Sequence, residues 1–272
     1  MSWTRIEDIQ APQLEPYRHL RTTNLTRFSG RFIAESKPLV ARLLASQLQV
    51  ESVLLDEAFV EEAQGWIPAD QSVWVVPSAM ISELIGFHFH RGYLACGLRP
   101  AMGTMDDLLQ KQAWGGATSQ RDRWTGVLLV GVQDPENLGS ILRTCSAFGI
   151  QDIVLGPQCV DPFARRVLRV SMGNAFKLRF FEVDDVHHAL RAFEQKGIES
   201  IAACLADDSE ELCEFARHGH SVVLFGNEAH GLPDDILTGC SRRLKIEMGL
   251  ATDSLNVSVA AGIILHNLCR IC

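Results

Sequence analysis

The sequence predicts an α/β protein with a small first domain and a larger second domain built on a mostly parallel sheet. Its 272 residues exceed what one small domain usually needs. Strand-like and helix-like segments alternate along the chain, and this alternation lapses once, over residues 101–123. The apolar content of 47% and the charged content of 21% are those of an ordinary globular protein. Both domains can therefore bury a core without help from a metal or a disulfide.

The first domain is expected in residues 1–100. From residue 32 onward its apolar periodicities predict five elements. They are a helix at 38–47, strands at 49–57 and 72–77, a helix at 78–87 and a strand at 92–97. Residues 101–123 then mix Pro, Gly, Ser and Gln with charges, which indicates a linker with room for a helical turn at 105–112.

The second domain is expected in residues 124–272. Strands are predicted at 125–132, 152–156, 178–183, 199–205, 221–226 and 243–248. Helices are predicted at 137–149, 185–197 and 254–268, and Gly149 and Gly197 stand where helices commonly end in a left-handed residue. Such alternation indicates a sheet covered on both faces, in which ligands bind beyond the carboxyl ends of the strands.

The net charge of −8 argues against a protein that binds nucleic acid over its whole surface. Local basic clusters remain compatible with RNA binding, although such clusters taken alone are more often solvated helix faces and loops. One cluster lies in residues 161–180, where Asp161 is the single acidic residue, and the other lies near the N-terminus. Their members are Arg165, Arg166, Arg169, Lys177 and Arg179 in the first, and Arg18, Arg21, Arg27 and Arg31 in the second.

The chain begins with polar and charged residues, and no window holds eighteen uninterrupted apolar residues. We therefore expect a cytoplasmic protein without membrane contact. Its eight cysteines are scattered, which favours reduced thiols over disulfides. Cys269 and Cys272 form an isolated C-x-x-C at the end of a helical segment, where packing or fraying is favoured over metal or redox chemistry. No metal site is expected.

Three polar segments follow predicted strands of the second domain. In the first, residues 131–150, Asn137 and Arg143 lie off the apolar stripe of a helix. Asn137 could cap that helix and Arg143 could be a solvated residue, but an arginine at a strand-to-helix turn is also a natural phosphate ligand. In the second, residues 221–233, Gly226 and Gly231 would let the backbone approach a ligand closely.

An ordinary turn would also account for Gly, Asn and Pro in that second segment, and His230 there is expected to be a surface histidine. In the third segment, residues 243–268, Ser254 is expected to be the N-cap of the last helix, with Asn256 in its first turn. Ala260, Ala261 and Gly262 permit close packing of this helix, against the sheet or against a second subunit.

The order and spacing of these segments resemble the three motifs of the SpoU branch of the SPOUT RNA methyltransferases, over residues 125 to about 267. Residues 167–178, with Ser171 and Gly173, are similar to the family's loop between the first two motifs. Residues 31–46, followed by a strand, are similar to an L30e-like RNA-binding domain. The resemblance implies a C-terminal α/β domain with a deep trefoil knot, which generic topology rules do not predict. It also implies a homodimer in which one subunit could complete the other's site.

The resemblance implies S-adenosylmethionine as cofactor, bound bent within the knot. Its adenosine would be held mainly by backbone groups, with Asn227 and Glu228 shaping the same pocket. The expected cofactor-binding residues are Leu224, Gly226, Asn227, Gly231, Ile246, Met248 and Leu255. The sequence departs from the family pattern at Glu247, where a proline is usual, and this would loosen the loop beside the adenine.

The resemblance further implies the catalytic residues, which we expect to be Arg143, Asn137, Glu228, Ser254 and Asn256. Because an arginine stays protonated, Arg143 is expected to bind a phosphate and stabilise the developing alkoxide, with the phosphate as one route for the proton. Asn137, Ser254 and Asn256 would orient the ribose and Arg143. RNA contacts are expected from Arg165, Arg166 and Arg169.

The predicted function is therefore transfer of a methyl group from S-adenosylmethionine to a ribose 2'-hydroxyl of structured RNA, either rRNA or tRNA. A non-catalytic RNA-binding relative is the main alternative, and the five intact candidate catalytic residues argue against it. A Rossmann-type nucleotide enzyme ranks far below, because no G-x-G-x-x-G follows a strand and no phosphate-binding G-x-x-x-x-G-K-[ST] occurs. A purely structural protein would not need three polar loops at strand ends.

Overall fold

The computed structural model describes residues 3–20, 29–110, 123–250 and 252–269. It divides into two compact units, and each is described by itself. Unit 1 comprises Met1–Ala101 and Asp161–Phe176, and unit 2 comprises Met102–Val160 and Lys177–Cys272. Arg21, Arg27, Cys272 and residues 111–122 of the expected linker lie outside the described residues.

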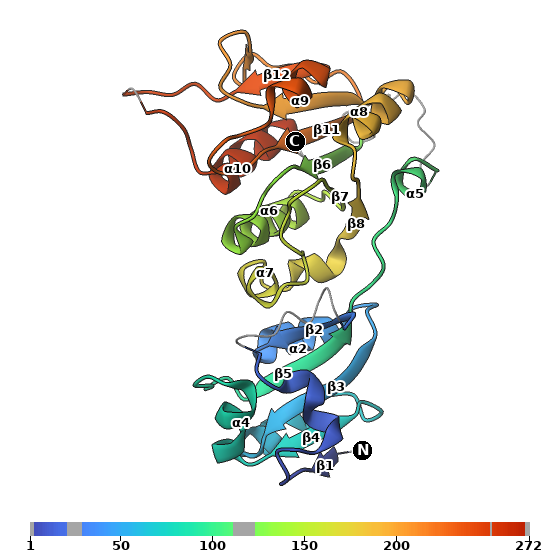
Figure 1. Cartoon of the computed structure of the whole chain (residues 1–272), viewed down its shortest axis with the longest axis vertical. Helices are drawn as coiled ribbons and strands as arrows, with labels where there is room; N and C mark the ends of the chain where they lie inside the picture. Colours follow the sequence, from blue (N-terminus) through green and yellow to red (C-terminus); the bar gives the residue numbers. More distant parts are fainter. Residues whose placement is uncertain (1–2, 21–28, 111–122, 251, 270–272) are drawn as a thin grey trace. The chain divides into compact units, whose positions relative to one another are not determined.

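Unit 1 is built on a five-stranded mixed sheet with the order β1-β4-β3-β5-β2 (Figure 1). The strands are β1 (Trp3–Arg5), β2 (Arg31–Glu35), β3 (Val50–Asp56), β4 (Val73–Val76) and β5 (Tyr93–Leu98). Its helices are η1 (Pro12–Tyr17), α2 (Lys37–Leu44), η2 (Glu57–Phe59), α3 (Val60–Ala63) and α4 (Ser78–Ile85). The five elements predicted here are confirmed. Their apolar residues form a core that includes Leu54, Ile81 and Leu94, and the buried Tyr17 hydroxyl is bonded to Ser52 at 2.8 Å.

Residues 161–176 belong to unit 1, although they follow the first strands of unit 2 in the sequence. They include α7 (Arg165–Val170) and lead into η4 (Asn174–Lys177). The rings of Phe163 and Phe176 lie 5.1 and 5.8 Å from the ring of Phe32 in β2. Arg99 binds the buried Asp161 carboxylate at 2.9 Å. Aromatic packing thus holds this segment against β2, and the ion pair holds it to Arg99, which directly follows β5.

Unit 2 is built on a seven-stranded sheet with the order β10-β12-β9-β11-β6-β7-β8, and every pairing recorded between these strands is parallel. The strands are β6 (Thr125–Leu129), β7 (Asp152–Leu155), β8 (Arg179–Glu182), β9 (Glu199–Ala203), β10 (Glu210–Glu211), β11 (Ser221–Phe225) and β12 (Arg242–Lys245). The predicted α/β class and mostly parallel sheet are confirmed. Phe225 pairs with Leu129, so the carboxyl ends of β11 and β6 lie next to each other.

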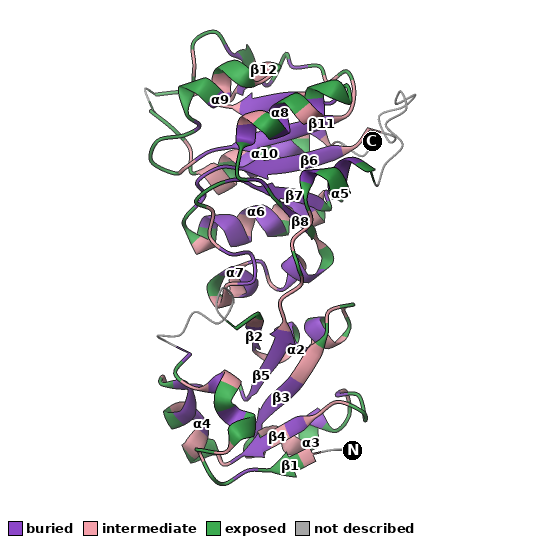
Figure 2. Ribbon diagram, turned by 45° about the vertical axis from the view of Figure 1, so that its right-hand side comes forward, coloured by how far each residue is buried: buried purple, intermediate pink, exposed green. Residues whose placement is uncertain are grey.

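Helices cover both faces of this sheet (Figures 1 and 2). They are α5 (Met105–Gln110), α6 (Pro135–Ala147), α8 (Val186–Gln195), α9 (Asp234–Gly239) and α10 (Val257–Leu268). Apolar residues of α5, α8 and α9 share one core with strand residues such as Leu128 and Leu224. Helices α6 and α10 pack against each other. The start of the expected linker therefore contributes Met105, Leu108 and Leu109 to the core of unit 2.

Two local predictions for unit 2 need correction. Helix α10 is capped by Asn256, whose side chain accepts from the Ser258 backbone N–H, so the expectation of Ser254 as N-cap is wrong. The strand predicted at 243–248 is observed at Arg242–Lys245, and Ile246 and Met248, which follow it, line a cavity. Gly149 and Gly197 have the expected positive φ, of 75° and 68°. No helix in the described part of the chain is long and apolar enough to cross a membrane.

Candidate active site

The three polar segments meet at the carboxyl end of the parallel sheet. Adjacent strands β6 and β11 lead into the first and second segments, and Asn256 at the start of α10 supplies the third. Asn137 is buried, with 7% of its surface exposed, and its side-chain amide donates to Glu228 Oε1 at 3.1 Å. Asn256 Nδ2 donates to Asn137 Oδ1 at 2.9 Å. Asn137 lies 91 positions before Glu228 and 119 positions before Asn256 in the sequence. The two hydrogen bonds thereby join all three side chains in one chain.

Glu228 is the acceptor on which this chain of hydrogen bonds ends. Besides Asn137, the backbone N–H groups of Asp134 and Gln133 donate to its carboxylate at 3.1 and 3.4 Å. Burial alone would raise the pKa of Glu228, but hydrogen bonds from its own backbone, Asn137, Asp134 and Gln133 outweigh burial and lower it. The carboxyl is therefore ionised at neutral pH. The ionised carboxylate thereby holds the Asn137 amide in one orientation.

The loop after β11 is closed by its own backbone. Asn227 N–H donates to the Gly231 carbonyl at 3.0 Å, and Gly231 N–H donates back to Asn227 at 2.9 Å. A Cβ on Gly226 would lie 2.2 Å from the Gly231 carbonyl carbon, so no other residue fits without moving the loop. Asn227 Nδ2 also donates to the Gly131 carbonyl at 2.8 Å. This amide fastens the second polar segment to the first.

A cavity of about 480 Å³, called here the first cavity, lies beside this loop. Six of the seven expected cofactor-binding residues line it, namely Gly226, Asn227, Gly231, Ile246, Met248 and Leu255. Glu228 and Ser254 line it as well. Leu224 is fully buried inside β11 and packs in the core of unit 2. The cavity combines apolar walls with closely approached backbone at Gly226, which suits an adenosine held mainly by main-chain groups.

Arg143 is not brought to the Asn137 network. It follows Asn137 by six residues on α6, which separates them by about 9 Å along the helix axis and by about 120° around it. Its side chain is exposed and forms no hydrogen bond or ion pair with the residues that the structure describes. Within one chain, the Arg143 guanidinium therefore points to a different part of the surface from the Asn137 side chain and forms no hydrogen bond with it.

The basic residues of the two clusters differ in how many contacts they already make within the protein. Arg165 is half-buried, stacks over Phe87 at 4.7 Å and lies 3.8 Å from Glu35, all within unit 1. Burial lowers the pKa of Arg165. Arg166 is exposed and Arg169 half-buried on the same helix. In unit 2, Arg179 makes two bonds to the buried Asp152 carboxylate, at 2.6 and 2.8 Å, and so has a structural role.

The N-terminal cluster is likewise engaged where it is described. Arg18 donates to the backbone carbonyls of Ile9 and Ala11 at 3.0 and 2.9 Å. Arg31 forms a two-pronged ion pair with Glu51 in unit 1. Both guanidinium groups thus serve the fold of unit 1.

A second cavity, of about 1070 Å³, shares the wall formed by residues 227–231 with the first. Asn137 and Glu228 line it together with Gln133 and Gln158, which the sequence did not single out. Gln158 follows β7 and has a φ of 62°, a conformation that few residues other than glycine adopt. Nothing in the local sequence signals this conformation, because it depends on the neighbouring β6 loop.

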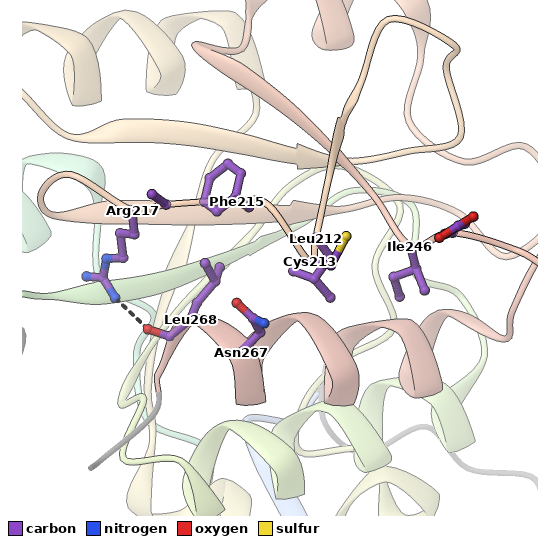
Figure 3. Close-up of a pocket in the computed structure, with 9 residues that line it drawn as sticks. Leu212, Cys213, Phe215, Arg217, Ile246, Asn267 and Leu268 are labelled. Carbon is purple, nitrogen blue, oxygen red and sulfur yellow. Dashed lines mark hydrogen bonds between the residues drawn. The ribbon is translucent and has the colours of Figure 1, made fainter.

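A third cavity, of about 700 Å³, lies on another side of Ile246 (Figure 3). Glu247, the departure from the family pattern, is exposed and lines this third cavity, not the first. Arg217 borders it and donates to the Leu268 carbonyl at the end of α10 at 3.4 Å. Its other donors bind Thr125, Trp124 and Gly219, so Arg217 fastens α10 to β6.

Among the described residues, no group of three or more His, Cys, Asp or Glu side chains could hold a metal ion. The seven described cysteines are free. Burial raises the pKa of Cys159 to about 11, so its thiol is protonated at neutral pH.

The chain is similar to RNA methyltransferases in sequence and in fold. Residues 125–266 match the model of the SpoU rRNA Methylase family. An uncharacterized tRNA/rRNA methyltransferase of Mycobacterium tuberculosis is 30% identical over 97% of this chain and 90% of its own. An rRNA methyltransferase of Sinorhizobium meliloti, solved with S-adenosylmethionine bound, superposes with a TM-score of 0.81 at 23% identity over 98% of each chain. An RNA 2'-O ribose methyltransferase superposes with a TM-score of 0.74 at 23% identity, over 97% of this chain and 98% of its own.

Proposed function

Because the chain belongs to the SpoU rRNA methylase family, which uses S-adenosylmethionine, we propose that it methylates the 2'-hydroxyl of a ribose in structured RNA. The observation that carries this proposal is the hydrogen-bonded chain from Asn256 through Asn137 to Glu228, set beside the first cavity. It joins all three polar segments at the end of the sheet where α/β proteins bind ligands. An RNA of ribosomes or a transfer RNA would serve as substrate.

The first cavity fits S-adenosylmethionine. Ile246, Met248 and Leu255 in its lining would contact the adenine, and the absence of a Cβ at Gly226 leaves the loop backbone accessible. Carboxylate and hydroxyl groups of Glu228 and Ser254 border the same space. When bound there, S-adenosylmethionine supplies an electrophilic methyl group attached to a sulfonium.

The side chains of the protein would prepare the acceptor. Asn137 is held in one orientation by Glu228 on one side and Asn256 on the other, so it presents a fixed edge to a ribose. Arg143 stays protonated and would bind the phosphate next to the acceptor ribose. As the 2'-hydroxyl gives its proton to a phosphate oxygen, the guanidinium would stabilise the negative charge that develops on the ribose oxygen.

Because Arg143 and Asn137 face different surroundings in one chain, we further propose a homodimer in which Arg143 of the partner subunit completes the site. Support comes from α10, whose Val259 and Ile263 remain 49% and 40% exposed beside the small residues Ala260 and Gly262. Such a face can bury apolar surface against a copy of itself across a two-fold axis. The free guanidinium of Arg143 would then have a phosphate to bind.

The test is transfer of labelled methyl groups from S-adenosylmethionine to total rRNA and total tRNA, followed by nucleoside analysis. We expect wild type to produce a 2'-O-methylated nucleoside and Arg143→Ala to produce none while its cofactor affinity is unchanged. Arg191→Ala is the matched control, since Arg191 is an exposed helical arginine on α8. Methylation of a base instead of a ribose would refute the proposed chemistry.

The dimer is tested by mixing two inactive variants. Arg143→Ala would lack the guanidinium, and Gly226→Ala would leave its cofactor sites empty when S-adenosylmethionine is held well below the weakened Kd of this variant, each on both subunits. In a mixed dimer one of the two sites would be intact, so we expect up to about half of the activity of that population to return. Mixtures that exchange subunits and stay inactive would show that Arg143 acts within its own chain.

A further inference from the structure

The second cavity is distinct from the cofactor space although the two share the loop at residues 227–231. It opens at the carboxyl ends of the adjacent strands β11, β6 and β7, where this class of sheet binds ligands. Its volume of about 1070 Å³ is sufficient for a nucleoside. The methyl donor in the first cavity and a group in the second would face each other across one loop.

Most polar side chains of the second cavity are already satisfied by the protein. Asp134 caps α6 by accepting from Glu136 N–H at 2.7 Å, and Asn227 binds the Gly131 carbonyl. Asn137 and Glu228 bind each other. In contrast, the side chains of Gln133, Gln158 and His230 form no hydrogen bond with any described residue. These three groups are available to a ligand.

Gln158 is held on a rigid support. The Gly131 N–H donates to the Pro157 carbonyl at 3.0 Å, and the Gly156 N–H donates to the Leu129 carbonyl at 2.8 Å. On the other side of Gln158, the Val160 N–H donates to the Val132 carbonyl at 3.0 Å. The turn is therefore fastened to the β6 loop before and after Gln158. A side chain on such a turn can bind a ligand without a large loss of backbone entropy on binding, because the turn is already ordered.

The charges of the cavity indicate the kind of group that it takes. No lysine or arginine is among the described residues that line it, whereas Asp134 and Glu228 are acidic, so a phosphate would be repelled. Apolar walls come from Val130, Val186 and Ile236. A planar neutral group with hydrogen-bonding edges fits both features. Glutamine amides carry a donor and an acceptor, which is the combination that reads the edge of a nucleobase.

We propose that the second cavity receives the base of the nucleotide that is methylated, and that Gln158, with Gln133, distinguishes that base from the others. This inference rests on the proposed function and adds the part of the substrate that the site would select. The adjacent phosphate would remain outside the cavity, where a guanidinium such as that of Arg143 can reach it. His230 at the shared loop is placed to stack on the base.

The binding test uses the full chain saturated with S-adenosylhomocysteine, so that the first cavity is filled. Adenosine, guanosine, cytidine and uridine are then titrated one at a time and followed by saturation-transfer NMR. We expect one base to be preferred, and we expect Gln158→Ala to reduce that preference about tenfold, as for loss of one specific base contact. Gln195→Ala, at an exposed position on α8, is the matched control and should keep the preference.

Equal binding of all four nucleosides, no binding of any, or an unchanged preference in both Gln158→Ala and Gln133→Ala would overturn the proposal. A second measurement uses RNAs that differ only in the base of the methylated nucleotide. Wild type should show unequal kcat/KM values, which converge in Gln158→Ala while cofactor affinity stays constant. Failure of the proposed function would look different, because wild type would then transfer no methyl group to the ribose of any RNA.

Discussion

Asn137 links all three polar segments, and replacing it by aspartate tests that link with almost no change in shape. Asn137→Asp exchanges the amide donor that faces Glu228 at 3.1 Å for a second carboxylate oxygen. The contact to Asn256 at 2.9 Å can persist, because that contact needs only an acceptor at position 137. The substitution therefore changes one hydrogen bond selectively and leaves the packing of α6 intact.

The expected cost follows from the geometry. A hydrogen bond to a charged group contributes about 1.5–3 kcal/mol, and this contribution is lost. Two like charges 3.1 Å apart repel by about 1 kcal/mol in bulk water and by about 5 kcal/mol at an effective dielectric of about 20. Glu228 is exposed whereas Asn137 is buried, so the repulsion lies toward the lower figure and the sum is about 2–5 kcal/mol. This corresponds to a fall in Tm of at least about 4 °C.

The pH dependence provides a second criterion. In wild type the Glu228 pKa is lowered, so its stabilising contribution is present above the ordinary carboxyl pKa of 4.5 and is lost as the pH falls through the lowered pKa. In Asn137→Asp the paired carboxyls repel, which raises their pKa in the folded state. The deficit of the variant should therefore be full at neutral pH and shrink toward acid, where a proton relieves the repulsion.

Thermal unfolding of wild type and Asn137→Asp between pH 4 and pH 8 measures both effects. Gln195→Glu adds the same charge at an exposed position and should change stability by no more than about 0.5 kcal/mol. An equal Tm for wild type and Asn137→Asp at neutral pH would refute the account of the network. A difference that widens toward acid would refute the assignment of repulsion as its cause.

Two further predictions concern the loop and the sheet edge of unit 2. Gly226→Ala forces the backbone away from Gly231 and so weakens the two backbone hydrogen bonds between Asn227 and Gly231, of about 1 kcal/mol each. Calorimetry should therefore show the affinity for S-adenosylmethionine falling at least about tenfold. Gly219→Ala, where a Cβ meets nothing within 4 Å, should leave that affinity unchanged, and equal effects of both substitutions would contradict the loop argument. Arg179→Met removes two hydrogen bonds from the buried Asp152 carboxylate, so denaturant titrations should show the free energy of unfolding lowered by about 1–3 kcal/mol. Cofactor affinity should not change. An unchanged unfolding midpoint would mean that the Arg179–Asp152 pair contributes nothing to stability.

The sequence by itself determined the class of the fold and the positions of the three polar segments. Apolar periodicity is a local property, so it located strands such as β6 and β11 and helices such as α6 and α8 to within a few residues. The order and spacing of the motifs pointed to the family to which the chain belongs. The deep trefoil knot, the homodimer and the cytoplasmic location stay predictions.

The tertiary structure alone decided which residues work together. Residues 161–176 pack in unit 1 because Phe163 meets Phe32, a contact between segments far apart in the sequence that no local pattern records. Asn256 caps α10 in place of Ser254, since its amide is also bonded to Asn137 across the site. Gln158 takes a positive φ on a turn fastened to the β6 loop. Each outcome depends on hydrogen bonds or packing between distant segments, and these form only when the sheet brings the strand ends together.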